Sequence, residues 1–134
     1  MNITYKPLLP ETQQPIIIIG ASGIVKDAHL PAYEMAGFTV FGITNRTISK
    51  AHDLAKQFKI EHVFENVAEA VKNAPSNAIY DITVLPDQYI EILEQLPDGS
   101  AVLIQKPMGN DLAQAREIVA VCERKKLVAA INFQ

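Results

Sequence analysis

An unbroken β-branched run passes directly into a glycine-containing turn at Ile16-Ile17-Ile18-Ile19-Gly20-Ala21-Ser22-Gly23-Ile24-Val25. A strand with one face in water alternates apolar and polar residues. Residues 16–19 are apolar throughout, which is typical of a strand buried on both faces of a parallel sheet. The pattern is repeated at residues 38–44, 78–85, 101–104 and 127–131, and residues 62–64 are a short, weaker candidate. Together these segments predict a sheet of about six strands.

Between the strands, apolar residues recur at i, i+3, i+4 and i+7, the spacing of one helix face. This spacing predicts helices over residues 51–58, 67–74, 89–96 and 115–122. The pair Asn66 and Glu69 has the pattern of a capping box, and Asp111 is placed to cap the last helix. Alternating strands and helices with right-handed crossovers predict an α/β fold, a Rossmann-like doubly wound parallel sheet with helices on both faces.

The composition is that of an ordinary globular domain. The chain has 134 residues, 49% of them hydrophobic and 20% charged, which is enough for one domain with its own core. The formal net charge of -3 argues against a nucleic-acid-binding surface. The single cysteine, Cys122, excludes an internal disulfide and a zinc site built from several cysteines of one chain. The sequence therefore predicts no metal site.

The two ends of the sequence add expectations about location. Residues 1–15 lack the basic and apolar segments of a signal peptide, and no apolar stretch is long enough to span a membrane. We therefore expect a cytoplasmic protein without membrane attachment. The proline-rich residues 1–14 predict an extended N-terminal arm, and residues 15–134 predict the folded domain.

The turn after the first strand is a partial match to the dinucleotide-binding fingerprint, which has glycines at its first, third and sixth positions. Gly20 matches the first position, but Ser22 and Val25 stand at the other two, and Gly23 offers a substitute one residue along. The backbone N–H groups from Ser22 through Ile24 to Val25 are placed to bind a phosphate at a helix start. The alternative is a plain strand-to-helix turn whose glycines serve geometry only.

The end of the second strand bears on the choice of cofactor. Asn45 lies about 20 residues after the turn, where an acidic residue would hold the ribose hydroxyls of NAD. Asn45 is able to hydrogen-bond a ribose, and Arg46 is able to stack on adenine or to bind a 2′-phosphate. NAD or NADP is therefore the expected cofactor, and NADP is slightly favoured. The alternative is that Asn45 or Thr47 caps the next helix.

Three motifs in order resemble the glucose-fructose oxidoreductase and inositol dehydrogenase family. They are residues 20–24, residues 27–32 (Asp-Ala-His-Leu-Pro-Ala) and residues 105–109 (Gln-Lys-Pro-Met-Gly). The resemblance runs from about residue 15 to residue 134. It implies that residues 15–134 are an N-terminal NAD(P)-binding domain, and that a C-terminal substrate domain with the proton-transfer residues lies outside this sequence.

The resemblance implies a catalytic lysine. The family has a Glu-Lys-Pro motif after the fifth strand, with its lysine near the nicotinamide and the substrate, and here the residues are Gln105, Lys106 and Pro107. A lysine at the carboxyl end of a strand points into the crevice, where its ammonium group steadies negative charge on a substrate oxygen. The resemblance also implies a cis bond before Pro107. An exposed loop lysine is the alternative for Lys106.

Further residues are expected near the cofactor from the same resemblance. Leu85 and Pro86 match the family's loop after the fourth strand, and Asn132 is expected at the crevice mouth. Where the family often has a histidine, this chain has Tyr89, which puts that contact in doubt. His29 is placed either to approach the phosphates or the crevice or to serve as a packing or capping residue, and we leave it out of catalysis.

Two functions follow from these features. The first is the NAD(P)-binding domain of an oxidoreductase acting on a sugar, polyol or related CH–OH substrate, inactive by itself, with the small-molecule substrate bound by the full-length parent. The second is a nucleotide-sensing or oligomerisation module without catalysis. Because a missing partner domain leaves apolar surface exposed, a homo-oligomer is expected in either case.

Overall fold

The computed structural model describes residues 10–133 and places six parallel strands in one sheet. In sheet order these are β3 (His62–Phe64), β2 (Val40–Thr44), β1 (Ile16–Ile19), β4 (Ile79–Ile82), β5 (Ala101–Gln105) and β6 (Val128–Asn132). The chain adds strands outward from β1 on one side, then crosses to β4 and continues on the other side. This reversal makes the predicted doubly wound sheet and sets a switch point between β1 and β4.

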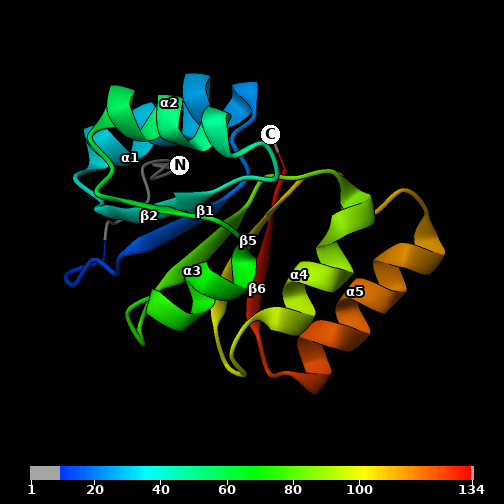
Figure 1. Cartoon of the computed structure of the whole chain (residues 1–134). Coiled ribbons are helices and arrows are strands. Elements are labelled where there is room, and N and C mark those ends of the chain that lie inside the picture. The colour runs from blue at the N-terminus through cyan, green and yellow to red at the C-terminus, as the bar shows by residue number, and fades with distance from the viewer. Residues whose placement is uncertain (1–9, 134) are drawn as a thin grey trace, which may run out of the picture.

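Helices cover both faces of the sheet, as Figure 1 shows. On one side lie α1 (Leu30–Ala36), which continues the π-helical turn η1 (Val25–His29), and α2 (Ile48–Phe58). On the other side lie α3 (Val67–Asn73), α4 (Tyr89–Gln95), which follows the 3-10 turn η2 (Pro86–Gln88), and α5 (Leu112–Arg124). All four helices predicted from periodicity are present, with ends displaced by a few residues.

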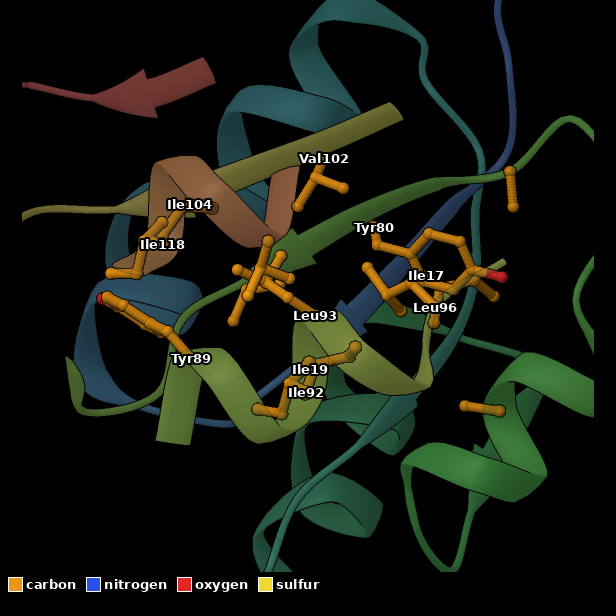
Figure 2. Close-up of a cluster of buried hydrophobic side chains, with 14 of the residues drawn as sticks. Ile17, Ile19, Tyr80, Tyr89, Ile92, Leu93, Leu96, Val102, Ile104 and Ile118 are labelled. Carbon is orange, nitrogen blue, oxygen red and sulfur yellow. The ribbon is translucent and has the colours of Figure 1, made fainter. Parts of the chain in front are cut away.

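Strand β1 is the centre of the core. Ile16 and Ile18 pack with the apolar residues under α1 and α2, and Ile17 and Ile19 pack with those under α4 and α5. All four side chains are at most 3% exposed. Figure 2 shows Ile17 and Ile19 among side chains of α4 and the neighbouring strands. The unbroken apolar run is therefore explained by burial on both faces, as predicted.

Two predicted strand segments were too long. The segment at residues 38–44 begins its strand only at Val40, because the Phe38 N–H donates to the Tyr33 carbonyl oxygen and so closes the end of α1. The segment at residues 78–85 ends its strand at Ile82, and residues 83–85 leave the sheet as a loop. Apolar residues continue past both boundaries because Phe38 and Val84 pack on the core and Leu85 lines the cleft, and hydropathy does not distinguish these positions from a strand.

The predicted helix caps are confirmed. The Asn66 side-chain oxygen accepts from the Glu69 N–H at 2.9 Å, and the Asp111 oxygen accepts from the Gln114 N–H at 2.8 Å. The Glu69 carboxylate, however, accepts from the Glu65 N–H at 2.7 Å, one residue before the capping residue. The capping bond from Asn66 is therefore present. The reciprocal bond to the Glu69 carboxylate comes from the Glu65 N–H, where a capping box would use the Asn66 N–H.

The predicted arm is only partly described. Residues 1–9 lie outside the described part of the chain, and residues 10–14 are exposed, without helix or strand. The Gln13 amide donates to the Ala36 carbonyl oxygen at 3.1 Å, at the end of α1. Within residues 10–133, no helix combines the length and the apolar character needed to cross a membrane.

Candidate functional site

A cleft of about 480 Å³ opens at the carboxyl ends of the strands, across the switch point between β1 and β4. In doubly wound folds this is where ligands bind. The residues that line it come from the glycine turn and the loops after β2, β4 and β5: Gly20, Ala21, Ser22, Ile24, Asn45, Arg46, Thr47, Lys50, Thr83, Val84, Leu85, Gln88, Gln105 and Lys106.

Gly20 anchors the first wall of the cleft. Its N–H donates to the Thr44 carbonyl oxygen at 2.8 Å, and the Thr83 N–H donates to the Ile19 carbonyl oxygen at 2.8 Å, so the turn is bonded to the strands on both sides. Gly20 has a φ of +120°, and a Cβ added there would lie 2.5 Å from the Thr83 hydroxyl oxygen. Only glycine fits this position without displacing its neighbour.

The two departures from the fingerprint have different consequences. Ser22 is exposed and lines the cleft, whereas Val25 is fully buried and packs into the core under α1 and α2. The Val25 and Lys26 N–H groups both donate to the Ser22 carbonyl oxygen, so helical bonding begins after residues 22–24. The N–H groups of these residues therefore lie at the first turn of the helix, where backbone donors lack intrahelical partners and phosphates bind. The bulk of Val25 points away from the cleft.

Gly23 lies beside the main cleft and is not one of the described residues that line it. It lies on a smaller adjoining hollow of about 230 Å³ together with Ser22, Lys26 and Lys50. A Cβ added at Gly23 would meet only the Asp27 carboxylate, at 4.0 Å. The surroundings of Gly23 are therefore open, unlike those of Gly20.

Asn45 braces the glycine turn. Its side-chain oxygen accepts from the Ala21 N–H at 3.0 Å, and its amide nitrogen donates to the Thr47 carbonyl oxygen at 2.9 Å. This bracing function was not predicted from the sequence. Thr47 does stand at the N-cap position of α2, although its side chain makes no capping bond to the described residues of that helix.

Two cations lie beyond Asn45 on the same wall. Arg46 and Lys50 are both exposed and line the cleft. Sequence reasoning missed Lys50, because no motif marks it and Arg46 precedes the helix that carries Lys50. The pair gives this end of the cleft a positive charge that attracts an anionic group.

The opposite wall is formed by the end of β5. Gln105 is only 7% exposed, and its side-chain oxygen accepts from the Lys106 N–H at 3.2 Å. Lys106 itself is exposed and lines the cleft, and the Lys106–Pro107 bond is cis, as expected. The fully buried Tyr89 donates its hydroxyl to the Gln105 carbonyl oxygen at 2.7 Å, and burial raises the pKa of that phenol. Tyr89 therefore supports the end of β5 from below and does not replace the family's histidine in the cleft.

The loop after β4 completes the cleft with Leu85, which is 67% exposed. Pro86 and Asn132 are not among the described residues that line it. Pro86 is buried, and its carbonyl oxygen accepts from the Gln114 amide at 3.1 Å. The Asn132 amide nitrogen lies 3.4 Å from the imidazole Nε2 of His29. Thr83, Val84 and Gln88 line the cleft without having been predicted, because no motif marks them.

Comparisons with known proteins agree with this geometry. An oxidoreductase family with an NAD-binding Rossmann fold matches residues 15–133. The uncharacterized protein YMR315W of Saccharomyces cerevisiae is 33% identical over 120 residues, covering 85% of this chain and 34% of that protein. The trans-1,2-dihydrobenzene-1,2-diol dehydrogenase of Mus musculus is 32% identical over 81 residues, covering 60% of this chain and 24% of that protein.

Solved structures show the same fold. An oxidoreductase of Thermotoga maritima superposes with a TM-score of 0.79 at 22% identity, covering 90% of this chain and 38% of that one. The 3-ketoreductase KijD10 of Actinomadura kijaniata, solved with NADP and TDP-benzene, gives a TM-score of 0.71 at 24% identity, covering 90% of this chain and 37% of that one.

These matches also show how much of such a protein the chain represents. It spans 34% of the yeast relative and 24% of the mouse relative. The predicted family and the predicted cofactor, a nicotinamide dinucleotide, are both confirmed by the family match. The chain belongs to the oxidoreductase family with an NAD-binding Rossmann fold, and residues 15–133 are its NAD-binding domain.

Proposed function

We propose that this domain serves a dehydrogenase or reductase that acts on a CH–OH or carbonyl group of a sugar, polyol or related diol. The observation that carries this proposal is the position of Lys106 on the rim of the cleft at the end of β5, opposite the glycine turn. The mouse relative is named a diol dehydrogenase, and a structural neighbour is named a 3-ketoreductase. Both names describe chemistry at an alcohol or a ketone.

The lining residues divide the work of binding. Ser22, Gly23 and Ile24 hold the pyrophosphate through their backbone N–H groups, and Gly20, whose own N–H is bonded to Thr44, shapes the turn that presents them. The bound dinucleotide supplies the hydride chemistry. Asn45 holds the turn and has one remaining amide hydrogen for a ribose hydroxyl, and Leu85 lines the cleft after β4.

At the reacting end, Lys106 donates a hydrogen bond to the substrate oxygen and steadies the negative charge that develops there. Gln105 fixes the backbone of this segment through the bond from its side-chain oxygen to the Lys106 N–H. Asn132, at the end of the neighbouring strand β6, pairs with Gln105 in register.

Substitution of Lys106 by alanine tests this role in the full-length protein that carries the domain. Loss of one donor to a developing oxyanion lowers turnover about 10²- to 10³-fold, with little change in cofactor affinity. Lys72→Ala, at an exposed position of α3, is the matched control. Unchanged turnover in the Lys106 variant contradicts the assignment.

We propose further that the domain prefers NADP. Arg46 and Lys50 place two cations at the end of β2, and no acidic residue is among the described residues lining the cleft. A 2′-phosphate carries up to two negative charges at neutral pH and binds such a pair, whereas a carboxylate at the Asn45 position would favour NAD.

Isothermal titration with NAD, NADH, NADP and NADPH measures this preference directly. Arg46→Ala and Lys50→Ala each weaken NADP binding about 10-fold, which corresponds to the loss of one charged hydrogen bond of about 1.4 kcal/mol. Binding of NAD stays within about two-fold of wild type, because the substituted groups face the 2′ position. Lys56→Ala on the exposed side of α2 is the control. An equal loss for NAD and NADP contradicts this role of the two cations.

One observation favours the second candidate, an assembly module. Strand β6 is an edge of the sheet, and Val128 on it is 71% exposed, with the adjacent Phe133 at 74%. Exposed apolar edge strands pair with other chains, so we propose that the isolated domain forms a homo-oligomer through β6. Sedimentation velocity of the 134-residue chain should show a dimer that Val128→Lys dissociates. A monomer at all concentrations contradicts this proposal and leaves the cofactor site unaffected.

A further inference from the structure

A buried carboxylate lies under the cleft, in the middle of the sheet. Asp81 is on β4 between Ile18 of β1 and Leu103 of β5, and its side chain is 0% exposed. Its Oδ2 atom accepts from the Tyr33 hydroxyl at 2.8 Å and lies 2.7 Å from Nδ1 of His29. Its Oδ1 atom has no hydrogen-bond partner among the described residues. Because a buried charge is costly unless it is paired, this carboxylate depends on His29 and Tyr33.

Both partners belong to the helix that begins at the glycine turn. His29 is the last residue of η1 and Tyr33 is in α1, four residues or about one turn further on. The turn residues 22–24 directly precede η1. Asp81 therefore fixes this helix to the sheet at two successive turns, and a change in this pairing is passed along a short helix to the N–H groups that face the cleft.

His29 also contacts the end of β6. Its Nε2 atom lies 3.4 Å from the Asn132 amide nitrogen at the end of β6. A neutral Nε2 accepts from this amide nitrogen, whereas a protonated Nε2 donates and requires the amide oxygen instead. Protonation of Nε2 therefore changes His29 from acceptor to donor in this contact. The Asn132 amide must then rotate so that its oxygen, in place of its nitrogen, faces the imidazole.

The imidazole has few titratable neighbours. Asp81 faces it from β4, and the Tyr33 ring from α1 meets it edge-on with ring centres 6.2 Å apart. From β6 it meets the uncharged Asn132, and the charged residues of its own turn, Lys26 and Asp27, are exposed. The hydrogen bond with Asp81 raises the pKa of His29, burial opposes this, and attraction to the Asp81 charge adds to it.

We propose that His29 is a positioning residue of the cofactor site, through which one proton sets both the placement of the glycine turn and the orientation of Asn132. The protonated form adds attraction between two opposite charges to the hydrogen bond with Asp81, and so holds the helix more tightly. Affinity for the dinucleotide is therefore higher when His29 is protonated. This last consequence rests on the proposed cofactor site, whereas the coupling within the free protein does not.

The coupling is tested first on the free 134-residue chain by NMR between about pH 5.5 and pH 9, a range that brackets the ordinary histidine pKa. The His29 ring signals, the backbone amides of residues 22–24 and the Asn132 side-chain amide should titrate with one midpoint. His29→Asn places a neutral, non-titrating amide donor near the position of Nδ1, and in this variant the turn signals should not titrate. His52→Asn, the same substitution at an exposed position of α2, should retain the wild-type transition.

Turn amides that do not follow the His29 midpoint, or that titrate unchanged in His29→Asn, overturn the proposal. If His29→Asn does not fold, Tyr33→Phe serves instead. It removes one hydrogen bond from Asp81 and leaves the imidazole, so the carboxylate attracts the His29 proton more strongly. The His29 midpoint should then move to higher pH and the turn midpoint should move with it. A turn midpoint that stays in place overturns the proposal.

Cofactor affinity is the second readout. NADH is the probe, because the 2′-phosphate of NADPH would itself titrate near pH 6. Its dissociation constant should rise about two- to five-fold as pH passes upward through the His29 midpoint. His52→Asn should behave like wild type, and His29→Asn should be flat. Binding that is flat in wild type overturns the effect on affinity. Absence of binding in all proteins at every pH rejects the cofactor site, and the NMR titration still decides the coupling.

Discussion

Replacement of Gly20 by alanine is the sharpest test of how the cofactor turn is built. The backbone at Gly20 has a φ of +120°, a conformation that costs a residue with a side chain about 1–3 kcal/mol. The new Cβ would also lie 2.5 Å from the Thr83 hydroxyl oxygen and 3.0 Å from the Thr83 carbonyl carbon. Overpacking of this kind costs about 1–3 kcal/mol. The sum, about 2–6 kcal/mol, is a large part of the stability of an ordinary domain.

Gly99→Ala is the matched control, because it isolates the cost of the backbone. Gly99 has a φ of +79°, and a Cβ added there meets nothing within 4 Å. This variant should lose about 1–2 kcal/mol from backbone strain alone. Urea unfolding of wild type and both variants measures the free energies of unfolding. Gly20→Ala should be the less stable variant by at least about 1 kcal/mol, and it should also lose cofactor affinity in a titration. Equal losses of stability in the two variants would refute the argument that Thr83 packs against this turn.

Two further predictions concern groups buried beneath the cleft. Tyr89→Phe removes the hydrogen bond to the Gln105 carbonyl oxygen and should lower the free energy of unfolding by about 1 kcal/mol; an unchanged urea midpoint would contradict the supporting role of Tyr89. The His29 pKa is raised in the folded protein above its ordinary value of 6.5, so the proton is bound more tightly in the folded state. The resulting stabilisation is fully present below pH 6.5 and is lost as pH rises through the folded pKa. The stability difference between wild type and His29→Asn should therefore shrink from pH 6 to pH 9, and a constant difference argues against the shift.

The fold could be predicted from the sequence because local residue patterns specify its strands and helices. Residues 16–19 carry no polar residue, which indicates burial on two faces, and helix α2 shows its apolar stripe at regular spacing. Strand ends were less readable. Phe38 packs at a helix end and Leu85 lines the cleft, so their hydropathy extends the pattern beyond the hydrogen-bonded ladder.

Only part of the candidate site could be predicted from the sequence. Gly20 and Lys106 were found because motifs mark them, and both line the cleft. The Asn45 bond to Ala21 joins residues 24 positions apart, and the His29 contact with Asp81 joins residues 52 positions apart. Such bonds leave no periodic signal, because only the sheet order brings the two segments together. Physical reasoning about side chains therefore needs the fold before it can assign these partners.

The bracing role of Asn45 has a consequence for how coenzyme choice can change in evolution or in the laboratory. At the end of β2, the residue that would ordinarily read the ribose is built into the turn itself, so its replacement disturbs the scaffold together with the specificity. Arg46 and Lys50 are solvent-facing and sit on the rim. The residues at these two positions can be replaced without loss of the folded state. A redesign from one coenzyme to the other should therefore begin at residues 46 and 50 and leave residue 45 intact.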